Sequence, residues 1–243
     1  MSLSLIIPVY NEESQIETTI RKLILFQKKF QQLEIIFIDD FSTDETKNKI
    51  HKLIRRKKFI KFYDNKKKGL GSAIQVGILK SKKNYICIFM ADLSDDFKDL
   101  KKYYLLMKSN KYDAILGSRF LKGSKISNYP ITKLILNRIF NNFVRIIFFS
   151  RYNDFTNAFK IYKRKSLLEL LPMVSENFNV FLEIPLKIIS RNYSYLIIPI
   201  NWNNRKHGKS KFKIKELGSM YIFTLLYCFI EKILLKKSLK KVI

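Results

Sequence analysis

Apolar runs and amphipathic segments alternate along the first part of the chain. Continuous apolar runs predict strands, and apolar positions that recur at helical spacing between them predict helices. The predicted strands cover 3–9, 33–40, 59–65 and 84–92. One predicted helix begins within 11–14, and two others cover 45–56 and 74–81. Strands that alternate with helices form an α/β fold with a mostly parallel sheet and right-handed crossovers. In such a sheet, ligands bind beyond the carboxyl ends of the strands.

Polar residues and glycines follow each of these four predicted strands. Because the carboxyl ends of parallel strands meet at one edge, these residues predict an acidic crevice lined with glycine. A single acidic residue after a strand is also typical of a helix cap, so the argument depends on the repetition. Carboxylates grouped around an open site suit a hard cation, Mg or Mn, that carries phosphates. The residues are Pro8, Tyr10 and Glu12, then Asp39 and Asp40, then Gly69 and Gly71, then Asp92 and Asp95.

The glycine segment GLGSA, residues 69–73, matches neither of two common phosphate-binding motifs. It lacks the third glycine of the dinucleotide fingerprint and the Gly-Lys-Ser/Thr ending of the P-loop. Since glycine has no Cβ, Gly69 and Gly71 predict a close approach of the backbone beside a nucleotide.

The formal net charge of +27 is the outlier in the composition. The electrostatic field of such a charge attracts nucleic acid, anionic lipid or phosphorylated substrates. The alternative explanation of the charge is a lysine-rich composition whose lysines lie on solvated faces and bind no partner. No nucleic-acid motif is present and an acidic crevice repels a phosphate backbone, so we expect no nucleic-acid partner. Cys87 and Cys228 lie in apolar segments and predict core thiols in a reducing compartment. The N-terminal segment lacks the basic region of a signal peptide.

Seven segments in order resemble one family of enzymes: LSLIIPVYNEE, IIFIDDFSTDET, KGLGSAIQVGI, MADLSDD, LGSRFLKGS, DFTNAFKIYKR and NNRKHGKSKF. Together they are similar to the inverting glycosyltransferases of family 2 with the GT-A fold. Within it the resemblance is to the branch of dolichyl- and polyprenyl-phosphate sugar transferases, the dolichyl-phosphate mannose synthase group. The resemblance covers 3–215 and implies a nucleotide-diphospho-sugar donor, a divalent metal and a polyprenyl-phosphate acceptor.

On the donor side, the resemblance places a first nucleotide-contacting turn at Pro8, Tyr10 and Glu12. It places Asp39 and Asp40 near the base and ribose.

The metal motif departs from the family pattern in this chain. Asp92 matches the last aspartate of the Asp-X-Asp motif, whereas Met90 stands where the family has the first aspartate. Ser94 stands where the family usually has a glutamine, and Asp95 becomes the additional ligand. We therefore expect Mg or Mn to bind through Asp92, Ser94 and Asp95 together with donor phosphates and water.

The acceptor side lies in the second half of the chain. By resemblance, Arg119 lies beside the phosphates, where a guanidinium suits bidentate contact, and Lys122 extends the basic turn. Asp154 precedes a strand, and Glu183 matches a position that faces the site, although a buried carboxylate at a helix start has the same pattern. A lipid phosphate is already anionic near neutral pH and needs no strong base, whereas a hydroxyl acceptor needs one, for which Asp95 and Asp154 are the candidates.

The segment 198–212 resembles the closing segment of the family. Arg205, Ser210 and Lys211 fall on its basic and small positions, and such a segment can fold over the leaving diphosphate. The single His207 within it is read as a surface residue.

The C-terminal part, 216–243, is predicted as a separate hydrophobic and basic helix after a glycosyltransferase domain at 1–215. Apolar residues run over 217–230, and lysines follow. This stretch is shorter than the ~20 residues of a spanning helix, so an interfacial helix on anionic lipid is expected. A core-packed helix or a dimer contact is the alternative, and the sequence leaves the oligomeric state open.

We therefore predict a metal-dependent glycosyltransferase that makes a polyprenyl-phosphate sugar, bound peripherally at the cytoplasmic face of the cell membrane. One alternative is transfer to a hydroxyl acceptor in cell-envelope glycan assembly. Another is a catalytically inactive basic relative that binds membranes.

Overall fold

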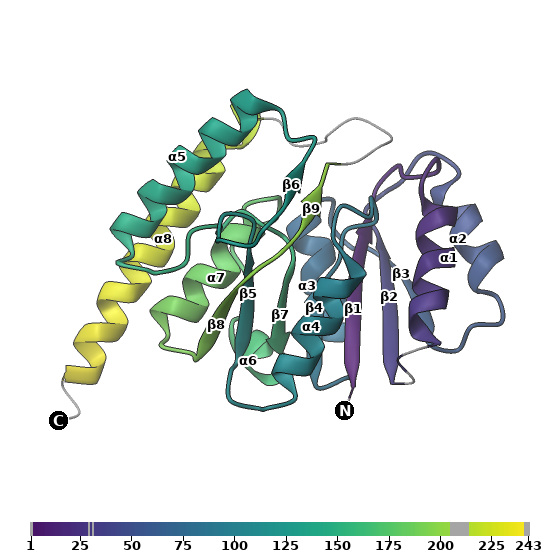
Figure 1. The fold of residues 1–243 in the computed structure, drawn as a ribbon, viewed down its shortest axis with the longest axis horizontal. Coiled ribbons are helices and arrows are strands. Elements are labelled where there is room, and N and C mark those ends of the chain that lie inside the picture. The colour runs from purple at the N-terminus through teal and green to yellow at the C-terminus, as the bar shows by residue number, and fades with distance from the viewer. Residues whose placement is uncertain (1, 29, 31, 205–213, 241–243) are drawn as a thin grey trace.

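The structure, a computed structural model, describes the chain except residues 1, 29, 31, 205–213 and 241–243 (Figure 1). A seven-stranded sheet lies at its centre, with strand order β3-β2-β1-β4-β7-β5-β8, and β6 and β9 form a separate ribbon. All neighbours in the large sheet are parallel except β7, which is antiparallel to β4 and β5. The strands are β1 (Leu3–Val9), β2 (Leu33–Asp39), β3 (Ile60–Asp64), β4 (Tyr85–Ile88), β5 (Ala114–Ser118), β6 (Ile126–Ser127), β7 (Lys160–Lys163), β8 (Tyr195–Pro199) and β9 (Trp202–Asn203).

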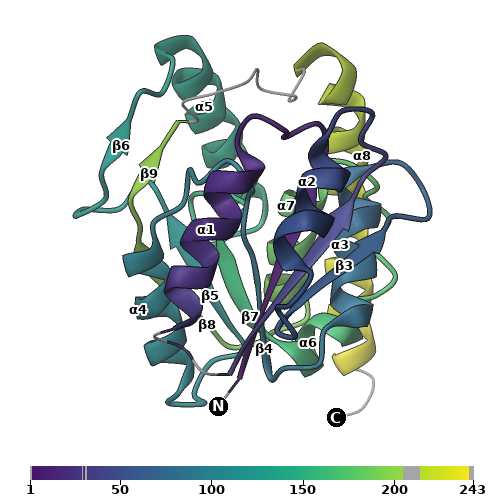
Figure 2. The ribbon, with the colours of Figure 1, turned by 90° about the vertical axis from the view of Figure 1, so that its right-hand side faces the viewer.

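Helices cover both faces of this sheet (Figures 1 and 2). One buried cluster joins the sheet to α1, α2 and α4, and a second joins its other face to α3, α5, α6, α7 and α8. This arrangement confirms the predicted α/β fold with a mostly parallel sheet. The helices are α1 (Ile16–Gln27), α2 (Thr46–Ile54), α3 (Leu70–Lys80), α4 (Phe97–Met107), α5 (Ile131–Ile147), α6 (Arg164–Glu169), α7 (Val180–Ser190) and α8 (Ile214–Lys240).

The central strand β1 is buried along its whole length, as its apolar sequence requires. Side chains alternate between the two faces of a strand, so Leu5 and Ile7 enter the cluster with α1 while Ile6 enters the cluster with α3. Strand order reverses at β1, which has β2 on one side and β4 on the other. A crevice at such a reversal is where an open α/β sheet binds ligands, and the predicted site residues follow these strands.

Two helix starts differ from the sequence prediction. Helix α1 begins at Ile16 rather than at 11–14, and α3 begins at Leu70 rather than at Ile74. The glycine turn is therefore shorter than predicted, and Gly71 lies in the first turn of α3.

Helices α5 and α8 lie side by side at one edge of the molecule (Figure 1). Within α8, the 18 residues Gly218–Leu235 are long and apolar enough to cross a membrane by length and composition. The predicted apolar stretch of 217–230 is shorter than this, because it ends before Glu231, whereas the helix continues through that residue. Glu231 pairs at 2.6 Å with Arg191, the C-cap residue of α7. Both helices expose large apolar side chains: Ile131, Ile135, Leu136, Ile139, Phe143 and Ile146 on α5, and Ile222, Phe223, Leu226, Ile230, Ile233 and Leu234 on α8.

Candidate active site

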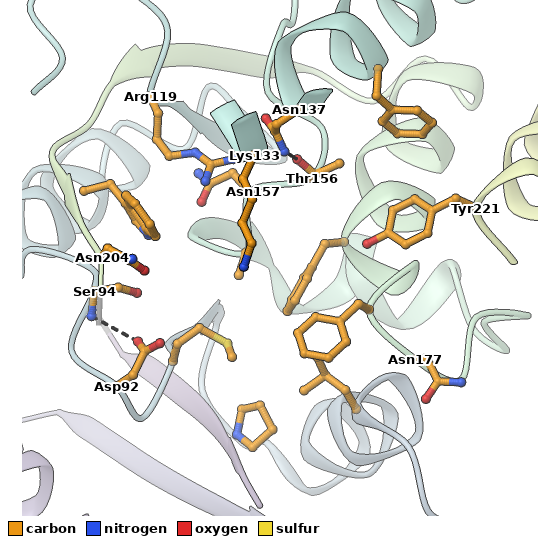
Figure 3. Close-up of a pocket in the computed structure, with 18 of the residues that line it drawn as sticks. Asp92, Ser94, Arg119, Lys133, Asn137, Thr156, Asn157, Asn177, Asn204 and Tyr221 are labelled. Atoms are coloured by element: carbon orange, nitrogen blue, oxygen red, sulfur yellow. Dashed lines mark hydrogen bonds between the residues drawn. The ribbon is translucent and has the colours of Figure 1, made fainter. Parts of the chain in front are cut away.

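A cavity of about 1030 Å³ opens at the carboxyl ends of β1 and β4 (Figure 3). One end is polar and the other is apolar, and the two ends are continuous. Residues that line the polar end include Tyr10, Glu12, Asp40, Lys68, Gly69, Asp92, Ser94, Asp95 and Arg119. Residues that line the apolar end include Leu136, Ile139, Phe140, Phe143, Phe178, Phe181, Tyr221 and Ile222, from α5, α7, α8 and the segment before α7.

Most of the predicted donor-site residues meet in this cavity. It is lined by Pro8, Tyr10, Glu12, Asp40, Gly69, Asp92, Ser94, Asp95 and Arg119. Five predicted residues do not line it, namely Asp39, Gly71, Lys122, Asp154 and Glu183. Arg205, Ser210 and Lys211, with His207, lie outside the described residues.

The pair Asp92 and Asp95 forms the acidic centre of the cavity. The Asp92 Oδ1 accepts the backbone N–H of Ser94 at 3.1 Å, which fixes the loop after β4 (Figure 3). The carboxylate of Asp95 is buried, and its Oδ2 has no hydrogen-bond partner among the described residues. Burial and the neighbouring charge of Asp92 raise the pKa of Asp95 to about 8. A pair of one buried and one partly exposed carboxylate fits a divalent cation, which would supply the partner that Asp95 lacks.

No group of three His, Cys, Asp or Glu side chains in the described ranges is placed to hold a metal. Met90 lines the cavity where a third carboxylate would stand by resemblance. A cation at Asp92 and Asp95 would therefore take its remaining ligands from donor phosphates and water.

Asp40 holds the glycine turn rather than pointing freely into the crevice. Its Oδ1 accepts the backbone N–H of Gly69 at 2.8 Å and the side-chain amide of Asn65 at 2.8 Å. Asp39 is buried beside it in sequence, with one oxygen accepting the N–H of Ser42 at 3.1 Å. Its Oδ1 has no partner in the described part of the chain, so it can still accept a hydrogen bond.

The two glycines allow a close approach, as predicted, but the approaching group is the protein's own backbone. A Cβ on Gly69 would lie 2.3 Å from the carbonyl oxygen of Glu176, and one on Gly71 would lie 2.2 Å from that of Ser175. Gly69 also has a φ of +139°, which a residue with a side chain rarely adopts. Only Gly69 lines the cavity, so Gly71 acts in packing.

Arg119 is anchored by Asp154 at the floor of the site. The Asp154 carboxylate accepts the backbone N–H and Nε–H of Arg119, both at 2.9 Å, and its Nη2 at 2.7 Å. Burial disfavours the charged guanidinium, but the charge and hydrogen bonds of Asp154 outweigh it, so the pKa of Arg119 is raised. The rings of Tyr129 and Trp202 lie 5.6 and 5.5 Å from the guanidinium carbon. One edge of the guanidinium is therefore used by Asp154, and the side chain of Tyr129 also forms a hydrogen bond with Arg119.

Glu183 and Lys122 do not face the cavity. Glu183 is fully buried, pairs with Lys187 at 2.6 Å and accepts the backbone N–H groups of Val174 and Ser175 at 2.9 and 2.7 Å. These contacts fit the alternative reading of a buried carboxylate at a helix start. Lys122 is exposed on the turn after β5, away from the cavity lining.

The sequence analysis did not single out a polar cluster on α5 and the segment before β7. Lys133 reaches from α5 into the cavity, towards the region of Asp92 (Figure 3). One turn further on, the Asn137 side chain donates to Thr156 Oγ1 at 2.8 Å, and both line the cavity with Asn157. The signal in the sequence was the i, i+4 spacing of Lys133 and Asn137, which places both on one face of the helix.

A mostly parallel sheet with a glycine-lined acidic crevice at its strand-order reversal agrees with the GT-A fold that the sequence resemblance implies. The chain belongs to glycosyl transferase family 2, whose family model matches residues 4–171. It is 28% identical over 222 residues to the dolichol-phosphate mannosyltransferase of Pyrococcus furiosus, a match that covers 89% of this chain and 61% of that protein. It is 24% identical over 239 residues to the polyprenol monophosphomannose synthase of Mycolicibacterium smegmatis, covering 88% of this chain and 85% of that protein.

The fold also matches solved structures. Glucosyl-3-phosphoglycerate synthase from Mycobacterium tuberculosis, in complex with Mn²⁺, UDP and glucosyl-3-phosphoglycerate, has a TM-score of 0.68 and 18% identity. The match covers 93% of this chain and 79% of that one. At this identity the likeness supports the fold alone.

Proposed function

We propose that this glycosyltransferase moves a sugar, with inversion, from a nucleotide-diphospho-sugar to a polyprenyl phosphate at a membrane surface. The observation that carries the proposal is the continuity of one cavity from an acidic, glycine-lined end to an apolar end. A polar donor and a lipid acceptor would meet where these ends join. The printed activities of the relatives from P. furiosus and M. smegmatis agree with this acceptor class.

The polar end has groups for a nucleoside diphosphate. Tyr10 offers an aromatic ring, with the Lys68 ammonium 5.3 Å from its centroid. Asp40 lines the same end, whereas Asp39 lies outside the cavity lining. Asp92 and Asp95 would hold Mg or Mn, which supplies positive charge to the leaving diphosphate. The Mn²⁺ and UDP named for the M. tuberculosis enzyme are in line with this assignment.

The cationic groups at the junction suit the acceptor phosphate. Lys133 has no hydrogen bond or ion pair in the described part of the chain, and its side chain points into the cavity (Figure 3). Arg119 lines the cavity together with Tyr129, and Asn137 follows Lys133 by one turn of α5. These groups would orient a phosphate oxygen towards the anomeric carbon, on the side opposite the leaving diphosphate.

The chemistry requires little from a base. A phosphate monoester has a second pKa of about 6, so its attacking oxygen is already anionic near neutral pH. The carboxylate of Asp154 is not available as a base, because both of its oxygens accept hydrogen bonds from Arg119 and it is fully buried. The site is therefore better suited to a phosphate acceptor than to a hydroxyl acceptor.

The apolar end would take the first part of the acceptor lipid, and the neighbouring helices would meet the membrane. The exposed faces of α5 and α8 form a two-helix apolar surface beside the cavity. Arg145 on α5 and Lys232 on α8 add positive charge to these two helices, which suits anionic lipid. This supports peripheral attachment at the cytoplasmic face, with the part from 216 onward as an attachment helix.

A transfer assay tests the proposal. The purified protein with Mn²⁺ is incubated with radiolabelled UDP- and GDP-sugars and either a polyprenyl phosphate or the matching polyprenol, and label in the organic phase is counted. We expect label only with the phosphate and with one donor series. Transfer to the polyprenol but not to the phosphate would establish a hydroxyl acceptor. Absence of both sugar transfer and nucleotide binding would indicate a membrane-binding relative without activity.

A further inference from the structure

The segment 173–179 is hydrogen-bonded to the donor end of the cavity. The backbone N–H of Gly71 donates to the carbonyl oxygen of Glu176 at 2.7 Å, which satisfies one of the open N–H groups at the start of α3. Gly69 and Gly71 approach the carbonyl groups of Ser175 and Glu176 too closely to admit a Cβ. A shift of this segment would therefore move the Gly69 turn, which lines the donor end and is held by Asp40.

The same segment is hydrogen-bonded to α8 through Thr224. The Thr224 Oγ1 accepts the side-chain amide of Asn179 at 2.8 Å and lies 3.2 Å from the Ser175 hydroxyl oxygen. Thr224 also donates to the carbonyl oxygen of Met220 at 2.8 Å, so Ser175 is the donor in their contact. Thr224 and Ser175 are fully buried, and hydrogen bonds between buried groups are costly to break.

The opposite side of α8 faces solvent. Phe223 and Leu226, on either side of Thr224 in the helix, are 59% and 54% exposed. Only 22% of the apolar stretch Gly218–Leu235 is buried, so a narrow stripe holds α8 in place. Lipid that covers the exposed side would remove apolar area from water. It would thereby stabilise the position of α8 in which Thr224 is hydrogen-bonded to the segment 173–179.

We propose that Thr224 is a positioning residue for the donor nucleotide, through which contact of α8 with an anionic membrane tightens nucleotide binding. The proposal rests on the proposed function, because it takes the polar end as a nucleoside diphosphate site. It adds a dependence of that site on the membrane. By linkage, the nucleotide must tighten membrane binding by the same factor.

Calorimetry with UDP and with GDP, each with Mn²⁺, tests the coupling with and without phosphatidylcholine vesicles that contain phosphatidylglycerol. For the nucleotide that binds, we expect vesicles to lower the Kd of the unaltered chain by about fivefold or more. Thr224→Val keeps the side-chain shape but removes the hydroxyl, and should lose this effect while still sedimenting with vesicles. Thr224→Ser keeps the hydroxyl and should retain it. If Thr224→Val does not fold, vesicle binding of the unaltered chain with and without nucleotide measures the same coupling factor.

The outcomes separate the two proposals. Nucleotide binding with the same Kd on and off vesicles, or equal vesicle effects in Thr224→Val and the unaltered chain, would overturn the coupling and leave the function standing. No nucleotide binding in folded protein, with or without vesicles, would overturn both.

Discussion

Replacing Asp154 by Asn tests whether this carboxylate is structural or catalytic. The Asp154→Asn side chain keeps one oxygen but places an N–H₂ group against the N–H groups of Arg119. Arg119 is 7% exposed and Asp154 is fully buried, with a 2.7 Å contact between them. Breaking a buried ion pair costs about 3–5 kcal/mol. The remaining oxygen and the rings near the guanidinium favour the lower end, so we expect about 3 kcal/mol, or a Tm lower by roughly 6–12 °C at 2–4 °C per kcal/mol.

The assay is thermal unfolding followed by circular dichroism, with Asp64→Asn as the control. Asp64 pairs with Lys47 at 2.6 Å, but the two side chains are 62% and 44% exposed, so its loss should change stability by at most about 0.5 kcal/mol. The double variant Arg119→Met with Asp154→Leu should recover most of the loss, because no buried charge is left unpaired. If Asp154→Asn melts like the control and loses turnover, Asp154 acts as a catalytic base and the structural reading is wrong.

Three further predictions concern the junction, the membrane surface and a buried lysine. Lys133→Gln should raise the acceptor KM by roughly 10- to 100-fold, the worth of a charged hydrogen bond, with the donor KM unchanged. Lys122→Gln, outside the cavity, is its control, and equal effects in steady-state kinetics would refute the assignment. Phe143→Asp should weaken sedimentation with anionic vesicles by about fivefold, because transfer of the half-exposed Phe side chain from water to lipid stabilises the bound state by roughly 1 kcal/mol. Leu79→Asp, at a similarly exposed position on α3, should not weaken it. Burial lowers the pKa of Lys160 from 10.5 to about 7, with Asp154 opposing and Arg119 adding to the shift. Between pH 7 and 10.5, Lys160 is protonated in the unfolded chain but neutral in the folded protein. The contribution of Lys160 to the free energy of unfolding therefore rises with pH. Relative to Lys160→Met, the unaltered chain should gain about 2 kcal/mol in urea unfolding between pH 6.5 and 9, and a pH-independent difference would contradict the lowered pKa.

The sheet and the polar end of the cavity could be predicted because their signals are local. The buried strands read as continuous apolar runs, and most of the polar residues and glycines at their ends meet in the cavity because parallel strands share an edge. The antiparallel insertion of β7 depends on long-range pairing with β4 and β5, which leaves no local mark.

The errors at the acceptor side have a common cause. The sequence predicts Asp154 and Glu183 as site carboxylates, but each forms an ion pair with a buried cation, Asp154 with Arg119 and Glu183 with Lys187. A sequence shows that a carboxylate is present without showing its partner. Lys133 was missed for the reverse reason, since a lysine on an amphipathic helix is ordinarily solvated, and only the fold places this one over the cavity.

The structure also changes how the C-terminal helix can be tested. Deletion of 217–243 would remove Thr224 and the buried Tyr221, Leu225 and Cys228 from the second core cluster. Such a deletion would lower stability as well as membrane binding. Substitutions on the exposed side of α8, as at Phe223 or Leu226, separate the two effects.

The most direct test of the central claim is the melting temperature of the purified chain with UDP, GDP and their sugars, each with and without Mn²⁺. A ligand at 100 times its Kd stabilises the folded state by about 2.7 kcal/mol, which corresponds to a rise of roughly 5–11 °C. We predict a rise of this order for one nucleotide series, dependent on Mn²⁺ and absent in Asp92→Asn. No rise with any nucleotide in folded protein, or an equal rise in Asp92→Asn, would contradict a metal-assisted donor site at Asp92 and Asp95.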